Sequence, residues 1–318
     1  MKTPISLIID DPAPLVSVYY HHNLTHKTQD GRDLPPTVPV KFLEKFADVV
    51  ERYGIAGKFS VIPVPGGVGR IDKPMPGIPE AEVRRWIEIA NTRLGKTFDF
   101  CPEINTHHNV WDIEKEIMLD VREDDWCDAQ NAETLTPYIA YALQILKNVG
   151  IDATGVTSPW AFGQHNEEDY ARAIGRAMEK VTGRKDSWYF LRSKCGEANV
   201  RPWLSVTEEG RRVVAIPGSV NDYMWQTMDM PDTSDEYVSR VADTYITSDG
   251  EKGLIPEALA MNSWVIMTTH WQSQFSAGLG TGLRVLETVA GRVEKHLADK
   301  VEWTRFSELM RRTLENEL

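Results

Sequence analysis

The sequence is poor in cysteine and has no long apolar run. Its three cysteines, Cys101, Cys127 and Cys195, are far apart and form no Cys-x-x-Cys pair. This spacing excludes a disulfide framework or a zinc knuckle, so we expect reduced thiols. No apolar stretch approaches the roughly 20 residues that cross a bilayer. Charged Asp10 and Asp11 stand where a signal peptide would be apolar, so we expect a soluble, cytoplasmic protein.

The sequence also has fewer positively charged than negatively charged side chains. The 47 acidic residues exceed the 35 lysines and arginines, which gives a formal net charge of −12. Such an excess repels nucleic acid phosphates and anionic membrane surfaces, so we expect neither as a partner. Neutral or cationic ligands, including small molecules and oligosaccharides, are compatible with this charge. The sequence leaves the oligomeric state open.

No Gly-x-Gly-x-x-Gly motif follows the first apolar run, which argues against an open dinucleotide-binding sheet. Apolar runs instead alternate with helical patterns. Strands are predicted at 5–9, 58–64, 98–104, 153–156, 188–191, 213–216, 264–267 and 300–303. Helices are predicted at 40–53, 79–94, 134–149, 167–181, 234–245, 283–297 and from 306. This order predicts a distorted β/α barrel of about seven parallel strands, formed as a single domain by residues 1–318.

Glycines and long connections punctuate this alternation. Four glycines follow predicted helices and are expected as left-handed C-terminal residues: Gly54, Gly95, Gly150 and Gly183. Thr304 is expected to cap the last helix. Residues 11–39 and 194–212 are predicted to be long loops, which more often shape binding sites than cores.

Three predicted strands end in groups that bind metals or move protons. The first ends at Asp10 and Asp11, the third leads into His107 and His108, and the seventh leads into His270. Parallel strands bring their carboxyl ends to one edge of the fold, where ligands gather. A carboxylate pair in a desolvated cleft is costly unless a cation or a shared proton offsets the repulsion. A metal or proton-relay site is therefore predicted at that edge.

The ordered segments LIIDD, EINTHHNVW, TSPWAFG, DSW and IMTTH resemble the polysaccharide deacetylase family, the carbohydrate esterases related to nodulation-factor chitooligosaccharide deacetylase. The resemblance implies a hydrolase that uses a divalent metal, most often zinc, to remove an acetyl group from an amino sugar. It also implies Asp10 as the catalytic base, Asp11 and His107 as metal ligands, and His270 as the general acid.

The sequence departs from the family pattern at two places. Trp111 occupies the position of the second ligand histidine, so His108, His21 or His22 is a candidate for the missing nitrogen, and His108 is our first choice. The family's arginine, which braces the catalytic base, is absent from Thr157–Ser158–Pro159–Trp160. Six residues are predicted to contact substrate: Trp160, Asp186, Trp188, Trp111, His22 and Asp222.

Other interpretations of these residues remain open. Asp10 and Asp11 before Pro12 also suit an exposed turn, and His270 also suits a core position. One alternative function is a glycoside hydrolase on a similar barrel, which pairs Asp10 or Asp11 with Glu103 or Asp222 and needs no cation. A second is a carbohydrate-binding pseudoenzyme that has lost the replaced histidine and arginine.

Overall fold

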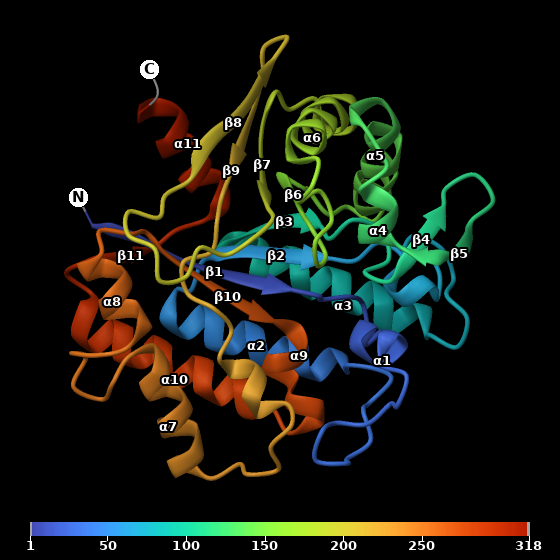
Figure 1. The fold of residues 1–318 in the computed structure, drawn as a ribbon. Coiled ribbons are helices and arrows are strands. Elements are labelled where there is room, and N and C mark those ends of the chain that lie inside the picture. The colour runs from blue at the N-terminus through green and yellow to red at the C-terminus, as the bar shows by residue number, and fades with distance from the viewer. Residues whose placement is uncertain (1, 317–318) are drawn as a thin grey trace.

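A parallel sheet forms the centre of the fold in the computed structural model, which describes residues 2–316. Its strands are ordered β10 (Val265–His270), β1 (Thr3–Asp10), β2 (Gly57–Val61) and β3 (Phe98–Pro102). A short strand, β11 (Val301–Trp303), also pairs with β1 in parallel. In Figure 1 the arrows of β1 and β2 point toward α1 (Val18–His22), so the carboxyl ends of these strands lie on that side.

A second sheet lies beside the first. It is ordered β6 (Gly155–Thr157), β7 (Asp186–Phe190), β9 (Arg211–Ala215) and β8 (Trp203–Glu208), and only β8 is antiparallel to its neighbour. Isolated bridges join the two sheets: Phe100–Ala153, Glu103–Thr157 and Val220–Met267. The α/β class with a parallel central sheet is thus confirmed, whereas a continuously closed seven-strand barrel stays a prediction.

Two antiparallel hairpins were not predicted. Strand β8 lies in the stretch 194–212, so the expectation of a loop there was wrong. Glu209 and Gly210, both with positive φ, form the tight turn between β8 and β9, a two-residue connection typical of hairpins. The other hairpin, β4 (Asn109–Asp112) and β5 (Ile117–Arg122), projects from the body beside α1 in Figure 1.

The helices match the periodic segments closely. The longer helices are α2 (Val40–Tyr53), α3 (Glu80–Thr92), α5 (Ala132–Asn148), α6 (Glu167–Thr182), α7 (Asp235–Tyr245), α10 (Thr281–Leu297) and α11 (Phe306–Asn316). Short helices, not predicted, are α4 (Glu123–Cys127), α8 (Leu254–Ala260) and α9 (Trp271–Phe275). Gly54 and Gly183 are left-handed C-caps as expected, but Gly95 lies within a 3₁₀ turn. Within residues 2–316 no helix is both long and apolar enough to cross a membrane.

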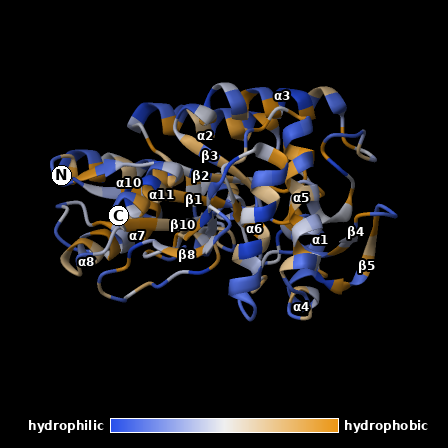
Figure 2. Cartoon of the chain, turned by 90° about the horizontal axis from the view of Figure 1, so that it is seen from above, coloured by the Kyte–Doolittle hydropathy of each residue, from blue (hydrophilic) through white to orange (hydrophobic). Residues whose placement is uncertain are grey.

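Aromatic packing under the central sheet fixes the end of β10. The rings of Phe46 on α2 and Phe59 on β2 lie 5.5 and 5.6 Å from that of Trp271, centre to centre. Trp271 is buried, so this tryptophan is part of the core and anchors the backbone directly after His270. Figure 2 shows both hydrophobic and hydrophilic colour on α3 and α5, as expected for helices with one face on the core.

The last helix is capped differently from the prediction. The hydroxyl of Thr304 donates to the carbonyl of Glu302, whereas the N–H of Ser307 in the first turn of α11 donates to Asp99 Oδ2 at 2.6 Å. Asp99 is buried on β3, and its other oxygen accepts a hydrogen bond from Arg305 at 2.9 Å. A residue distant in sequence therefore satisfies the helix start, which no local pattern could reveal.

Replacing Asp99 with alanine is expected to lower the free energy of unfolding by about 2 kcal/mol, because it removes the helix cap and leaves Arg305 without its carboxylate. Urea denaturation followed by circular dichroism measures this change. Arg84→Ala is the control, since its ion pair with Glu80 is exposed and is worth less than about 0.5 kcal/mol. Equal effects of the two substitutions would contradict the cap.

Candidate functional site

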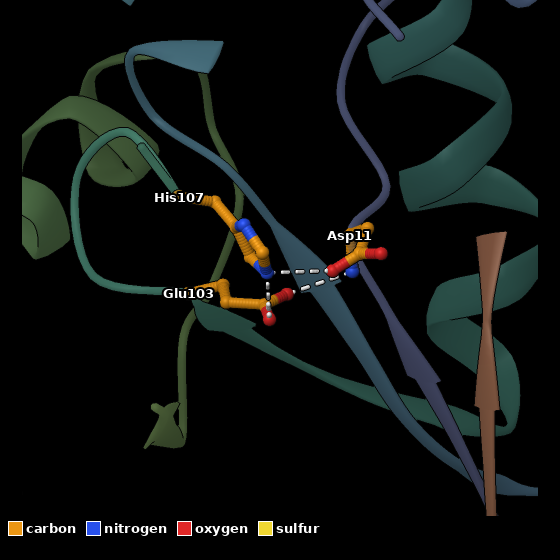
Figure 3. Close-up of side chains that lie close together, drawn as sticks. All are labelled: Asp11, Glu103 and His107. Carbon is orange, nitrogen blue, oxygen red and sulfur yellow. Dashed lines mark hydrogen bonds and ion pairs between the residues drawn. The ribbon is translucent and has the colours of Figure 1, made fainter. Parts of the chain in front are cut away.

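Three buried side chains meet at the carboxyl ends of the strands: Asp11 directly after β1, Glu103 directly after β3, and His107 in the loop that follows (Figure 3). His107 Nε2 lies 3.0 Å from Asp11 Oδ1 and 3.5 Å from Glu103 Oε1. The backbone N–H of Asp11 donates to Glu103 Oε2 at 2.7 Å. One potential ligand atom from each of the three lies within 4.8 Å of the others, and no other such group of His, Cys, Asp or Glu occurs in residues 2–316.

The backbone around this group adopts an unusual conformation. Asp11, Ile104, His107 and Trp160 have φ values of 70°, 47°, 51° and 45°, in the left-handed region that non-glycine residues rarely occupy. Such residues cost of order 1 to 3 kcal/mol each and persist where the surroundings fix them, often at functional sites. At Asp11 this conformation follows directly on β1 and places the carboxylate beside His107.

Glu123 holds the loop that carries His107, and the sequence analysis did not identify it. Its carboxylate accepts the backbone N–H groups of Asn105, Thr106 and His107 at 3.2, 3.1 and 2.9 Å, and the Tyr138 hydroxyl at 2.7 Å. Complete burial raises the pKa of Glu123 to about 7, although these donors oppose the increase. An acidic residue about 16 positions beyond the histidine carried no local signal of this contact.

Protons balance the charge of the three side chains in the metal-free protein. Burial lowers the pKa of His107, but the Asp11 carboxylate outweighs burial and raises it to about 9. For Asp11, burial acts to raise the pKa, and the neighbouring His107 lowers it overall. Burial, followed by repulsion from Asp10 and Asp11, raises the pKa of Glu103 to about 8. Protons on His107 and Glu103 thus provide the compensation that a bound cation would provide.

The three side chains suit a divalent cation. Two carboxylates and one imidazole are donors found in zinc, manganese and iron sites. Within the described part of the chain, His107 Nδ1 is buried without a hydrogen-bond partner, and Asp11 Oδ1 has no partner other than His107 Nε2 at 3.0 Å. Two of the three predicted ligands, Asp11 and His107, lie in this group, and Glu103 joins them. The predicted ligand His108 lies outside it, and its Nδ1 is 3.1 Å from Asn109 Oδ1.

Asp10 faces a different partner from Asp11. Its Oδ1 forms an ion pair with Lys58 of β2, and Lys58 Nζ also donates to Ser60 Oγ at 2.9 Å and Thr157 Oγ1 at 2.7 Å. Lys58 is fully buried, which by itself lowers its pKa, but the Asp10 carboxylate raises the pKa overall. The sequence contained a signal, since a lysine inside a buried strand requires a counter-charge, but we assigned it no role.

His270 and Asp222 form a second pair at the same edge. His270 Nδ1 is 2.8 Å from Asp222 Oδ2, which also accepts the backbone N–H of His270 at 3.1 Å. Burial lowers the pKa of His270, but Asp222, and then the Asp11 carboxylate, raise it to about 10. Asp222 bonds His270 in the structure, and its predicted contact with substrate stays a prediction. Trp225 lies edge-on to the imidazole, with ring centres 5.2 Å apart.

Trp160 and His22 border the buried group. The Trp160 ring centre is 4.6 Å from that of His107, and 37% of the residue is exposed, so it offers a face to a ligand. The Arg122 guanidinium lies over the same ring at 4.4 Å. His22 on α1 has its ring centre 5.5 Å from that of His107, and burial, followed by repulsion from His107, lowers its pKa to about 3.

The other three residues predicted to bind substrate lie elsewhere. Asp186 begins β7, at the opposite edge from the site, and bonds Arg212 at 2.6 and 2.8 Å. Trp188 is fully buried and donates from Nε1 to Thr154 Oγ1 at 3.1 Å. Trp111 is buried on β4 and donates to the Tyr141 hydroxyl at 3.2 Å. A short motif match gives no information on which way a side chain faces.

The fold resembles that of several solved proteins. A protein from Mycobacterium smegmatis assigned as a polysaccharide deacetylase matches with a TM-score of 0.52 and 13% identity over 87% of this chain and 78% of its own. The chain therefore has a deacetylase-like fold. A mutant CE4 family pseudoenzyme matches with a TM-score of 0.44 and 9% identity, covering 97% of this chain and 67% of its own. A GH57-type branching enzyme from Pyrococcus horikoshii matches with a TM-score of 0.49 and 13% identity, covering 98% and 70%.

These similarities concern the fold. At 13% identity the match with the mycobacterial protein does not extend to its activity, and the other two have TM-scores below 0.5. The sequence matches no protein family model and no curated protein. Any function of this chain therefore has to be argued from its own side chains.

Replacing Asp222 with asparagine is expected to lower the pKa of His270 from about 10 toward its ordinary value of 6.5, because the hydrogen-bonded carboxylate is lost. The same pair stabilises the wild-type fold below pH 6.5, and this contribution disappears as the pH rises through about 10. An NMR titration of the imidazole signals measures the shift. Asp128→Asn, beside exposed His165, is the control and should leave His270 unchanged. An unchanged His270 in Asp222→Asn would contradict the assignment.

Proposed function

We propose that this chain is a metal-dependent hydrolase that removes an acyl group, such as acetyl, from the nitrogen of an amino sugar or a related amide. The observation that carries the proposal is the buried group of Asp11, Glu103 and His107 at the strand ends, adjacent to Asp10 and on the same edge as His270. The deacetylase-like fold supports it. Amide hydrolysis needs an activated water, a base and a proton donor, and these residues are able to provide each requirement.

Asp11, Glu103 and His107 would hold the cation, which we propose to be zinc or another divalent ion. When bound, such an ion polarises the amide carbonyl and lowers the pKa of a water ligand. The burial of the three side chains keeps bulk water from competing for their oxygen and nitrogen atoms. It also strengthens every electrostatic interaction within the group, because the surroundings polarise weakly.

Asp10 is proposed as the base that accepts the proton of the attacking water. It is the last residue of β1, immediately before Asp11, and Lys58 holds its Oδ1, so the orientation of the carboxylate is fixed. Lys58 also contacts Thr157, in the segment where the family resemblance expects an arginine. A buried cation on β2 is thus placed to perform the bracing that the missing arginine would provide from the segment after β6.

His270 is proposed as the general acid. Asp222 holds its Nδ1, so Nε2 is the nitrogen free to donate a proton to the leaving amine. The raised pKa of His270 keeps the ring protonated at neutral pH. Breakage of the carbon–nitrogen bond then yields a carboxylate and a free amine, and Trp160 provides an exposed ring on which a sugar could stack.

A second candidate is carbohydrate binding without hydrolysis. It is favoured by the Asp10–Lys58 ion pair, which occupies one oxygen of the proposed base, and by Trp111, which offers no ligand nitrogen. A glycoside hydrolase has less support. The carboxylates that it would use each have a partner already: Lys58 for Asp10, the Asp11 N–H for Glu103 and His270 for Asp222.

We expect purified protein to bind one divalent ion and to release acetate from N-acetylated chitooligosaccharides in a chelator-sensitive reaction. Asp11→Asn should lose both properties, because it replaces a negatively charged ligand with a neutral amide, which binds a divalent cation much more weakly. Asp10→Asn should retain the metal and lose roughly 100-fold or more in kcat, the usual contribution of a general base. Elemental analysis and an acetate assay measure the two effects separately.

The outcomes distinguish the candidates. Metal-free protein that still cleaves glycosidic bonds after chelation would replace the proposal with a glycoside hydrolase. Oligosaccharide binding with no acetate release from any variant would favour a binding protein. Equal metal loss in Asp10→Asn and Asp11→Asn would contradict the separate roles assigned to the two carboxylates.

Lys58→Met is expected to reduce kcat/KM about 10- to 100-fold with unchanged metal content, since Asp10 loses the contact that orients it. In the Asp10→Asn background, Lys58→Met should cause little further loss, because the base is already absent. Steady-state kinetics on the four proteins of this cycle measure the coupling. Additive losses would show that Lys58 acts independently of Asp10. In the double variant both the carboxylate and the ammonium group are absent, so no buried charge is left without a partner.

A further inference from the structure

We propose that His22 is an additional ligand of the cation held by Asp11, Glu103 and His107. This inference rests on the proposed metal-dependent function and names a residue from a different part of the chain. His22 lies on α1, in the loop between β1 and β2, whereas the family resemblance expects the second histidine at the position of Trp111. The sequence analysis preferred His108 for the missing nitrogen and kept His21 and His22 as alternatives.

The position of the His22 ring supports the assignment. Its centre is 5.5 Å from that of the His107 ring. Two imidazoles that bind one ion through nitrogens about 2.1 Å away have ring centres roughly 5 Å apart. His22 Nε2 is buried and has no hydrogen-bond partner among residues 2–316. A buried ring nitrogen without a partner is costly unless a ligand satisfies it.

The site also fixes α1 beside His107. Gly66, with a φ of 58°, lies so close to α1 that a Cβ there would be 2.7 Å from the His21 Cβ. The N–H of Gly66 donates to the carbonyl of Thr106 at 2.9 Å, and the N–H of Val64 donates to that of Asn105 at 2.8 Å. The turn under α1 is therefore bonded to the segment that carries His107, so the two histidines are held in one connected unit.

The other candidates are placed less well. His108 is half-buried, and its Nδ1 is directed to Asn109. His21 packs edge-on to Tyr20, with ring centres 5.5 Å apart, and its Cβ lies against Gly66. Trp111 donates its indole N–H to Tyr141. His22 Nε2 itself is outside the group of atoms that lie within 4.8 Å of one another, so the proposal requires the His22 side chain to rotate toward Asp11 when the ion binds.

Zinc affinity tests the assignment without reference to activity. Zinc binding is measured by competition with a chromophoric chelator in the wild type, His22→Ala and His21→Ala. His22→Ala should weaken binding by more than the roughly 10- to 100-fold that the loss of an outer partner of a ligand costs. His21→Ala is the matched control, since it removes the adjacent imidazole of the same helix, and should bind zinc as the wild type does. Circular dichroism checks that each variant folds.

X-ray absorption of the zinc-loaded proteins counts the bound imidazoles. We expect two in the wild type and in His21→Ala, and one in His22→Ala. Zinc bound by the wild type and by His22→Ala with equal affinity, and a single imidazole in both, would overturn the role of His22 and leave the proposed function standing. A wild type that binds no zinc would overturn both.

Discussion

Compensation of buried negative charge governs this structure. Asp10, Asp11 and Glu103 are all buried at the ends of two strands, where unpaired carboxylates would repel one another strongly. Lys58 neutralises one of them, and the protons on His107 and Glu103 compensate the remainder. The adjacent acids at the end of β1 therefore differ in kind: Asp10 has a permanent cation beside it, whereas Asp11 has a partner whose proton a metal ion can replace.

Backbone contacts keep this arrangement in place. Ile104 and His107 adopt left-handed conformations in the loop after β3, and Glu123 accepts the three N–H groups between and including Asn105 and His107. The strain at Ile104 and His107 is thus offset by hydrogen bonds to Glu123, which lies outside the group of Asp11, Glu103 and His107. Trp271 similarly fixes the backbone next to His270, because its ring is packed among the aromatic side chains of the core. The positions of the proposed site residues therefore depend on residues such as Glu123 and Trp271, which lie outside the site.

The sequence predicted most of the elements and part of the site. Periodicity placed the seven main strands and the long helices, because each buries one apolar face or run. Asp10, Asp11, His107 and His270 were found because they follow such strands. Lys58, Glu123 and the capping role of Asp99 were missed, since each acts through a partner far away in the chain. Asp186 and Trp188 were misplaced because a motif gives no direction for a side chain along a strand.

The pairing of the strands affects the order in which the proposed site forms while the chain is being synthesised. β1 pairs on one edge with β2, the next strand along the chain, and on the other with β10, which is synthesised long after β2. Asp11, Glu103 and His107 come from the first part of the chain, whereas His270 is added much later. The nascent chain can thus bring the side chains of the proposed metal site together while β1 still has an open edge, before the proposed proton donor is synthesised.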